Sequence, residues 1–331
     1  MNSSRLSRLV VIGAALTLGL AACSSSSTGS SSSSAAPAGA ASAAVAPSGI
    51  TIAMITHETP GDTYWDIIKA GAKASAAEHG ITLKYSSDPD FTKQATLVQN
   101  AIDSKVNGIA MTAAGPDALK DVVGAANKAK IPVVMFDSGI DDYQRLGAMM
   151  YFGSDEYVAG QALGKKISQA GGKNTLCVIH QEGSVALEAR CKGVGEGVAS
   201  KNMQVNGTDD ASVKASITAK LQQDPTIDYI VTMGAPLALV ALDAVNTAGS
   251  KAKIATFDLN LAAAKEIKKG TIAMAVDAQP YVQGYEAVDS LWRYLTNGND
   301  IGGGKAVLTG PSIVDASNID LILPFAEKGT R

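Results

Sequence analysis

The sequence predicts an α/β protein with two similar lobes, each built on a doubly wound parallel sheet. From Ile50 onward, short apolar runs alternate with longer amphipathic segments, the order that repeated strand–helix units produce. Most of the runs are continuous and β-branched, which is typical of strands buried on both faces. About 280 residues follow Ile50, a length that suits two hydrophobic cores better than one.

Ten apolar runs predict the strands. In chain order they are ITIAMIT (50–56), ITLKYSS (81–87), GIAMT (108–112), IPVVMFD (131–137), AMMYFG (148–153), TLCVIH (175–180), MQVNG (203–207), DYIVTM (228–233), KIATFD (253–258) and TIAMAV (271–276). The segments between them have helical patterns, for example DALKDVVGAANKAK (117–130) and APLALVALDAVNTAG (235–249). This order predicts helices on both faces of each sheet.

An internal duplication divides the array in two. The run that starts at 131 ends on Phe136-Asp137, and the run that starts at 253 ends on Phe257-Asp258. In open α/β sheets, ligands bind beyond the carboxyl ends of the strands. Two lobes that face each other would therefore place both Phe-Asp pairs across one cleft.

Residues 1–22 have the features of an export signal peptide. They contain Arg5 and Arg8, followed by an apolar segment of 12 residues, fewer than the roughly 20 that span a bilayer. The sequence Leu-Ala-Ala-Cys that ends at Cys23 resembles the bacterial lipobox, which implies a lipid on that cysteine. An ordinary signal followed by a chance cysteine is the alternative.

Residues 23–49 are nearly all Ser, Ala, Gly and Pro. Such a segment has little apolar surface to bury, so we expect a flexible tether that holds a folded body away from a membrane. A disordered leader with no role would have the same composition.

The net charge bears on which partners the protein can bind, and its cysteines bear on whether it contains a disulfide. Removal of residues 1–22, which contain two arginines and no acid, changes the formal net charge from −3 to −5, so nothing indicates a nucleic-acid partner. Cys177 lies in a predicted strand and Cys191 in the next helical segment. In an exported protein we expect them to form a disulfide, with two buried free thiols as the alternative.

Catalytic and metal-binding motifs have no positive support. The three histidines, His57, His79 and His180, lack the spacing of a zinc helix motif. The segment GQALGKKI (160–167) has three residues between its glycines where a phosphate loop needs four, and no G-x-S-x-G nucleophile elbow occurs. We therefore expect no enzyme, no metal and no cofactor.

Polar residues at strand ends suit an uncharged polyhydroxyl ligand. Asp137, Asp258 and Asp277 each follow an apolar run, and a carboxylate can accept hydrogen bonds from two neighbouring hydroxyls. Arg190 offers a planar fork of donors. The adjacent Tyr64 and Trp65 offer flat apolar faces for the C–H side of a sugar ring.

Simpler interpretations exist for each of these residues. A strand-end aspartate is often only a helix N-cap. Arg190 could be a surface residue paired with Glu188 or Glu196. Tyr64 and Trp65 could both be core, although adjacent helical residues point about 100° apart, so that one can pack inward while the other faces the cleft.

Six segments together resemble a known family. They are GDTYWDIIKAGAKASA, PDALKDVVGAANKAKIPVVMFDSG, YFGSDEYVAGQALG, EARCKGVGEG, KIATFDLN and DAQPYVQGYEAVDSL. With the lipobox, their order and spacing resemble the type I periplasmic sugar-binding family, the ribose-binding-protein-like components of ABC importers, over residues 50–331.

The resemblance implies two lobes that close over a sugar about three hinge crossovers. The crossovers would fall near Ser154-Asp155, near Gln279-Pro280 and around Thr309 to Ile313. The N-terminal lobe would comprise residues 50–153 plus 280–308, and the C-terminal lobe residues 154–279 plus 309–331.

The resemblance also implies a set of ligand-binding residues. The family's binding aromatics correspond to Tyr64 and Trp65, and its other contacts to Asp62, Asp137 with Ser138, Arg190 and Asp258. The polar contact near the second crossover would be Asp277 or Gln279, and the choice between them stays open. Ribose-type members often carry Asn-Asp where this chain has Gly234-Ala235, so ribose is doubtful as the ligand, and His180 with Gln181 would replace the lost contact.

The implied function is that of an extracytoplasmic solute-binding lipoprotein. It would capture a monosaccharide or polyol, deliver it to an ABC transporter permease, and be held at the cell membrane through the lipid on Cys23. We expect a monomer. The alternative keeps the fold and changes the ligand to a nucleoside or a signalling molecule for a sensor, and a secreted carbohydrate enzyme is the least supported reading.

Overall fold

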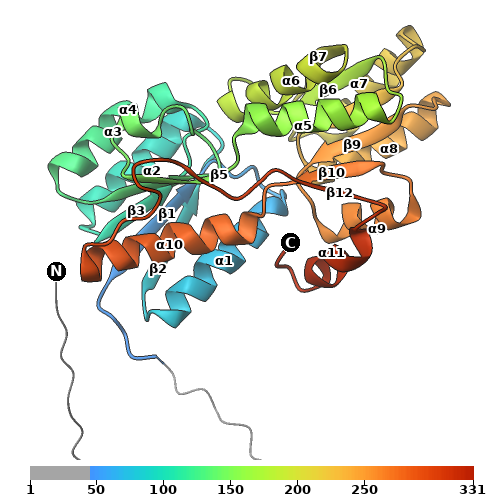
Figure 1. Ribbon diagram of the computed structural model, residues 1–331. Coiled ribbons are helices and arrows are strands. Elements are labelled where there is room, and N and C mark those ends of the chain that lie inside the picture. The colour runs from blue at the N-terminus through green and yellow to red at the C-terminus, as the bar shows by residue number, and fades with distance from the viewer. Residues whose placement is uncertain (1–44) are drawn as a thin grey trace, which may run out of the picture. The chain divides into compact units, whose positions relative to one another are not determined.

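The computed structural model describes residues 45–331, which form two α/β lobes (Figure 1). We call them the N-lobe and the C-lobe. The predicted signal peptide 1–22, Cys23 and all but the last residues of the predicted tether lie outside the described residues. The predicted fold class, two parallel-sheet α/β lobes, is confirmed.

The N-lobe sheet has the strand order β11-β5-β4-β3-β1-β2, and every neighbouring pair is parallel. Its strands are β1 (Thr51–Thr56), β2 (Thr82–Ser87), β3 (Gly108–Met111), β4 (Val133–Phe136), β5 (Met150–Gly153) and β11 (Val307–Leu308). Alternate residues of β1 enter different cores: Met54 packs under α1 (Tyr64–Glu78) and α10 (Pro280–Asn297). Ile55 packs on the opposite face under α2 (Phe91–Asp103), α3 (Pro116–Lys128) and α4 (Tyr143–Leu146).

The C-lobe sheet has the strand order β12-β10-β9-β8-β6-β7, in which only the β10–β12 pair is antiparallel. Its strands are β6 (Thr175–Ile179), β7 (Ser200–Gln204), β8 (Tyr229–Thr232), β9 (Lys253–Phe257), β10 (Met274–Asp277) and β12 (Ser312–Asp315). One face carries α5 (Glu156–Gln169) and α6 (Val185–Gly197). The other carries α7 (Asp210–Gln223), α8 (Ala235–Ala248), α9 (Leu261–Lys269) and α11 (Ile319–Glu327).

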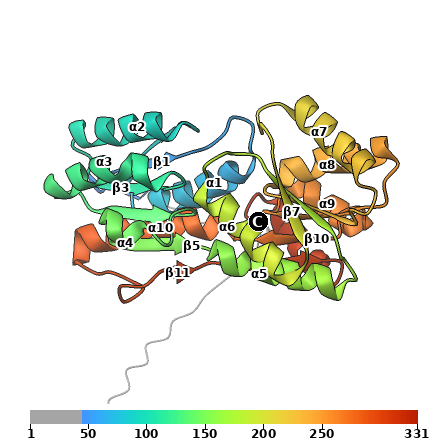
Figure 2. The ribbon, with the colours of Figure 1, turned by 90° about the horizontal axis from the view of Figure 1, so that it is seen from above.

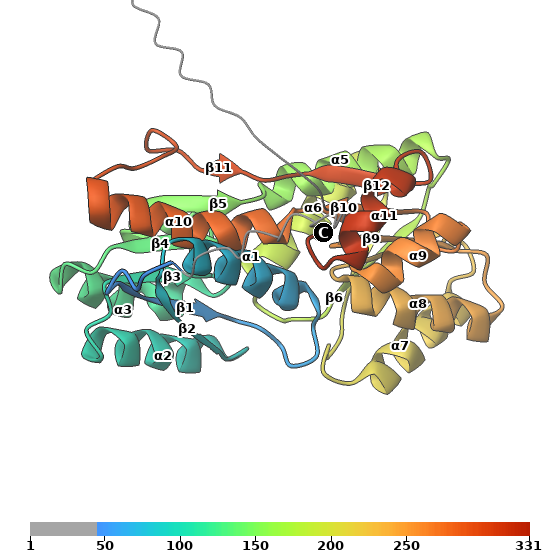
Figure 3. The ribbon, with the colours of Figure 1, turned by 90° about the horizontal axis from the view of Figure 1, so that it is seen from below.

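The views from above (Figure 2) and below (Figure 3) show that helices cover both faces of the sheet in each lobe. Figure 2 shows α2 and α3 side by side on the N-lobe and α7 and α8 side by side on the C-lobe. Figure 3 shows α1 and α10 side by side on the opposite face of the N-lobe. No helix within residues 45–331 has the length and apolar character needed to cross a membrane.

Helices α5 and α6 pack closely together, and glycines permit the approach. A Cβ on Gly160 would lie 2.2 Å from the carbonyl oxygen of Arg190, and one on Gly193 would lie 2.2 Å from that of Tyr157. A disulfide joins Cys177 in β6 to Cys191 in α6, with the two Cα atoms 5.9 Å apart. Helix α6 is thus held both to its neighbouring helix and to the sheet beneath it.

The chain passes between the lobes three times. It does so between β5 and α5, between β10 and α10, and between β11 and β12. The last two connections touch, because the Thr309 hydroxyl donates to the Ala278 carbonyl oxygen at 2.7 Å. Gln283 Nε2 donates to the same carbonyl oxygen at 2.9 Å.

Candidate ligand-binding site

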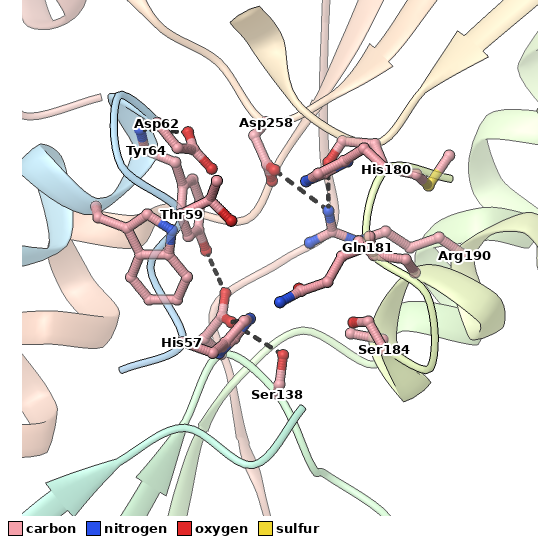
Figure 4. A pocket seen from close by; sticks show the side chains of 15 residues that line it. His57, Thr59, Asp62, Tyr64, Ser138, His180, Gln181, Ser184, Arg190 and Asp258 are labelled. Carbon is pink, nitrogen blue, oxygen red and sulfur yellow. Dashed lines mark hydrogen bonds and ion pairs between the residues drawn. The ribbon is translucent and has the colours of Figure 1, made fainter. Parts of the chain in front are cut away.

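A cavity lies between the two lobes, at the carboxyl ends of strands from both sheets. The space among its lining residues is about 420 Å³, and this figure includes volume that is open to solvent. The lining residues are His57, Thr59, Asp62, Tyr64, Trp65, Asp137, Ser138, His180, Gln181, Ser184, Ala186, Leu187, Arg190, Met233 and Asp258. Figure 4 shows His57, Tyr64 and Ser138 of the N-lobe across the cavity from His180, Gln181 and Arg190 of the C-lobe.

Asp137 and Asp258 have the same backbone geometry in the two lobes. Asp137 follows β4 with φ +65°, and Asp258 follows β9 with φ +64°. The Asp137 N–H donates to Phe152 O at 2.9 Å, and the Asp258 N–H donates to Val276 O at 2.8 Å. Each aspartate therefore leaves its strand in the left-handed region and is still tied to the next strand of its sheet. Neither caps the following helix, because α4 begins after Asp142 and α9 after Asn260.

Two hydroxyl groups hold the Asp137 carboxylate. Tyr64 Oη donates to Oδ1 at 2.7 Å, and Ser138 Oγ donates to Oδ2 at 3.0 Å. Tyr151 Oη donates to the Asp137 carbonyl oxygen at 2.7 Å. The carboxylate is thus fixed by neutral donors from α1 and from the residue that follows it.

Arg190 of α6 lies buried between two acids and an aromatic ring. Its Nε donates to Glu156 Oε2 at 2.5 Å, and its Nη1 donates to Asp258 Oδ2 at 3.2 Å. Its guanidinium carbon lies 4.8 Å from the centre of the Phe257 ring. The surface pairing with Glu188 or Glu196 is not the one found, because the packing of α5 on α6 brings Glu156 to Arg190 instead.

The Asp258 carboxylate is only half satisfied. Oδ1 is buried and has no hydrogen-bond partner among the described residues, while Oδ2 accepts from Arg190. Burial raises the pKa of Asp258 to about 8; Arg190 lowers it, and Glu156 and Asp137 raise it further. An unpartnered buried acceptor costs free energy that a ligand hydroxyl would recover.

A third acid lies at the edge of the cavity. Asp62 precedes α1, and its Oδ1 accepts the Tyr64 N–H at 3.0 Å. Burial raises the pKa of Asp62 to about 6, the Tyr64 N–H lowers it, and the nearby Asp137 raises it. The cavity therefore presents three carboxylates and one guanidinium, an arrangement rich in hydrogen-bond acceptors.

Two histidines line the cavity in neutral form. Burial lowers the pKa of His180 to about 4, and Arg190 and His57 lower it further. Burial also lowers the pKa of His57, against the opposing effect of Asp137. His180 Nδ1 is buried without a partner in the described part of the chain. His57 Nδ1 lies 2.7 Å from Thr112 Oγ1.

Tyr64 and Trp65 both line the cavity and both belong to the N-lobe core, with exposed fractions of 5% and 4%. Their rings meet edge to face with centres 5.4 Å apart, and Trp65 meets His57 in the same way at 4.9 Å. Core and cavity wall are therefore not alternatives at these positions. Each ring contributes to both.

Two of the predicted residues are not part of the cavity. Asp277 Oδ2 accepts from Arg331 Nε at 2.7 Å, and Asp277 Oδ1 accepts the Gln279 N–H at 2.7 Å. Gln279 Oε1 accepts from Arg331 Nη1 at 3.0 Å. In this structure Asp277 and Gln279 thus form a cluster that ties the second crossover to Arg331.

Sequence reasoning missed several lining residues. They are His57, Thr59, Ser184, Ala186, Leu187 and Met233. His57 directly follows β1, so the strand-end rule that selected Asp137 applied to it equally. Within residues 45–331, no group of three or more His, Cys, Asp or Glu side chains is placed to hold a metal ion.

Comparison with known proteins agrees with this architecture. The model of the periplasmic binding protein domain matches residues 52–300. The crystal structure of a carbohydrate transporter from Acidothermus cellulolyticus 11B in complex with myo-inositol is 55% identical, covers 85% of this chain and 99% of its own, and has a TM-score of 0.84. The ribose import binding protein of Haemophilus influenzae is 26% identical and covers 84% of this chain and 89% of its own. The D-apiose import binding protein of Actinobacillus succinogenes is 28% identical and covers 83% and 91%.

Proposed function

The chain belongs to the periplasmic binding protein family, and from this premise we propose that it captures a cyclic polyol between its lobes for an ABC importer. It is a binding protein and not an enzyme, as are the import binding proteins to which it is similar. A nucleoside or signalling ligand is not favoured, because the relatives named above import or bind sugars and polyols.

One observation carries the choice of ligand class. Asp258 Oδ1 is a buried acceptor without a partner, and it faces a cavity already rich in carboxylates. A ligand that fits must donate hydrogen bonds from several of its ring substituents. A cyclitol such as myo-inositol meets this requirement, because it carries a hydroxyl on every ring carbon. The structure that is 55% identical to this chain holds myo-inositol. We therefore put myo-inositol first, and monosaccharides such as ribose or arabinose after it.

We propose divided roles for the lining residues. Asp62, Asp137 and Asp258 would accept ligand hydroxyls, and Arg190 would donate through Nη2, which makes no hydrogen bond within the described residues. Figure 4 shows a guanidinium nitrogen of Arg190 directed into the cavity. Tyr64 would hold Asp137 through its hydroxyl. Trp65 would then be the residue that supplies a ring face to the C–H side of the ligand.

We propose that the lobes close over the ligand about the three crossovers. We propose hinge points at 154–155, 278–280 and 309–311, with the lobe boundaries expected from the sequence. The two lobes meet around the cavity through the Val185 N–H, which donates to Ala114 O at 3.1 Å. They also meet through Asn260 Nδ2, which donates to Thr63 Oγ1 at 3.0 Å. Opening breaks these two bonds and exposes the cavity.

The family acts outside the cytoplasmic membrane, and we propose that Cys23 carries the lipid that keeps this protein there. Residues 24–49 would act as the tether and the folded body as a monomer that docks on a permease. Mass spectrometry of the protein from a membrane fraction tests this proposal. A mature N-terminus at Cys23 with an added diacylglycerol is expected, and an unmodified Cys23 would refute it.

Calorimetry against a panel of ligands tests the proposed function. The panel contains myo-inositol, other cyclitols, ribose, arabinose, glucose and two nucleosides. At a hundredfold excess over Kd, the true ligand should add about 2.7 kcal/mol to the free energy of unfolding. We expect the largest effect from a cyclitol and none from the nucleosides. A panel in which no sugar or polyol binds would refute the proposal.

A further inference from the structure

His57 lines the cavity from the N-lobe. On the side away from the cavity, a chain of buried hydrogen bonds connects its ring to two further residues. His57 is 7% exposed, and its Nε2 lies 4.0 Å from Asp137 Oδ2. Its Nδ1 lies 2.7 Å from Thr112 Oγ1, and Thr112 in turn contacts Gln94. Both Thr112 and Gln94 are fully buried, and neither lines the cavity.

The orientation of the Gln94 amide is fixed by a group that can only accept. The Thr112 backbone carbonyl oxygen lies 2.9 Å from the Gln94 side chain, so the atom that faces it must be the nitrogen, Nε2. The same Nε2 lies 3.1 Å from Thr112 Oγ1 and donates to it. Gln94 therefore gives its two protons to the two oxygens of one threonine.

The Thr112 hydroxyl then has one acceptor left for its own proton. Gln94 Nε2 is a donor, so within the described residues His57 Nδ1 at 2.7 Å is the remaining partner. If Nδ1 accepts this proton, it carries none itself. A neutral imidazole has one N–H, and here it must be on Nε2, on the side of Asp137.

We propose that Gln94 and Thr112 are positioning residues that hold His57 as the Nε2–H tautomer, so that the N-lobe wall offers a ligand one N–H donor beside its carboxylate acceptors. The proposal rests on the proposed function for its ligand, and on the hydrogen-bond chain alone for the tautomer. Neutral His57 is consistent with the lowered pKa that burial gives this ring.

This arrangement makes one position of the ligand different from its neighbours. The Asp62 and Asp137 carboxylates each require a hydroxyl that donates, whereas an oxygen next to His57 Nε2 must accept. Without the hydrogen bond from Thr112, the ring could turn an acceptor nitrogen to the cavity, and the N–H donor beside Asp137 would be lost. His57 is thereby a specificity-determining residue. Which of its nitrogens carries the proton is set by Thr112 and Gln94, which do not line the cavity.

Nitrogen NMR of the histidine side chains tests the tautomer directly. In the free wild-type protein, with His57 assigned by comparison with His57→Asn, we expect Nε2 protonated and Nδ1 unprotonated, and the same after addition of myo-inositol. Protonated Nδ1 in the free protein would overturn the proposal. This measurement requires no bound ligand, so it decides the tautomer even if the proposed ligand class fails.

Paired variants test the effect on binding. Thr112→Val removes the hydroxyl at nearly constant shape, and we expect mixed tautomers at His57 and about tenfold weaker binding of myo-inositol. Thr112→Ser keeps the hydroxyl and should restore both the tautomer and most of the affinity. Equal affinities for the valine and serine variants would overturn the proposal.

Thr175→Val is the matched control for the valine substitution. Thr175 is also fully buried, but it is at the start of β6 and its hydroxyl has no partner among the described residues. It should change neither the His57 tautomer nor the affinity. If Thr175→Val weakens binding as much as Thr112→Val, the loss comes from a general perturbation of the structure. The proposed roles of Gln94 and Thr112 are then refuted.

Discussion

The N-lobe and the C-lobe present an aspartate to the cavity with the same backbone and different partners. Asp137 and Asp258 share a left-handed φ and a backbone bond to the neighbouring strand. In the N-lobe, hydroxyls of Tyr64 and Ser138 occupy both carboxylate oxygens. In the C-lobe, Arg190 is shared between Asp258 and Glu156, and one Asp258 oxygen has no partner within residues 45–331.

Two lobes with the same backbone can therefore hold their ligand-facing carboxylates by different electrostatic means. In the N-lobe wall, neutral hydroxyl groups rather than a cation hold the Asp137 carboxylate. The C-lobe wall is a buried cluster of two acids and one arginine, so its energy depends on every charge in it. Changes to the C-lobe cluster should therefore cost more and respond to pH.

The largest effect is expected from Arg190→Ala. Removal of the guanidinium leaves Glu156 and Asp258 buried without their cation, and loss of one partner from a buried pair costs about 3–5 kcal/mol. Urea unfolding measures the loss, and calorimetry should show no ligand binding. Arg145→Ala is the control, because Arg145 is exposed and pairs with Asp117 and Asp142 at the surface. Equal losses in both variants would contradict the proposed role of the cluster.

Removal of the disulfide should have the next largest effect, and it should be confined to the C-lobe. Cys177 and Cys191 are separated by 14 residues, and a closed loop of that size contributes about 3 kcal/mol. The variant Cys177→Ala/Cys191→Ala should unfold at lower urea concentration than the oxidised wild type. Reduced wild-type protein should match the variant. An unchanged unfolding midpoint in both would show that the bond does not stabilise this lobe.

Asp137→Asn and Asp258→Asn compare the two walls directly. In Asp137→Asn, the amide nitrogen replaces one of the two oxygens that accept from the Tyr64 and Ser138 hydroxyls. The free energy of unfolding should fall by about 1–3 kcal/mol, because two donors then face each other. An amide at 258 keeps an acceptor for Arg190 and replaces a carboxyl that its pKa of about 8 keeps largely protonated at neutral pH, so stability should change little. Both variants should weaken binding. A larger loss of stability for Asp258→Asn would reverse the comparison.

The smallest effect is a pH dependence that belongs to the C-lobe. The pKa of Asp258 in the folded protein is about 8, above its ordinary value of 3.8, so the folded state binds the extra proton between these values. Stability contributed by this proton is present at low pH and is lost as pH rises toward 8.

Burial lowers the pKa of His57 and of His180 from the ordinary value of 6.5. These two histidines therefore make stability rise with pH, but only below pH 6.5. Between pH 6.5 and 8, the ligand-free protein should therefore lose stability by at most about 1.4 kcal/mol per pH unit. Urea unfolding across this range measures the slope. Asp258→Asn should flatten it, and a slope that survives in this variant would assign the proton to another group.

Much of the fold could be predicted because its strands are buried on both faces. The ten apolar runs correspond in order to β1–β10. The prediction of a strand at 203–207 was displaced, because β7 is Ser200–Gln204, an exposed edge strand whose polar residues give no apolar signal. The short strands β11 and β12 were missed, since two- and four-residue strands in crossovers leave little pattern.

The site was predictable where a residue type and a strand end coincide, as at Asp137 and Asp258. It was not predictable where a side chain depends on partners distant in the sequence. Glu156 reaches Arg190 only because glycines let α5 approach α6. The proposed role of His57 depends on Thr112, which is 55 residues away. No local pattern contains that information.

The left-handed backbone at Asp137 and Asp258 limits how selectivity can be redesigned. Asp, Asn and Gly are the residues that adopt such a backbone readily, so most other side chains at these two positions would strain the chain. Gly234, beside His180, has an extended backbone with φ −168°. A Cβ there would meet only His180 Cε1 at 3.8 Å and Pro236 Cδ at 3.9 Å. A library that seeks a new polyol should therefore keep the two aspartates and vary residue 234.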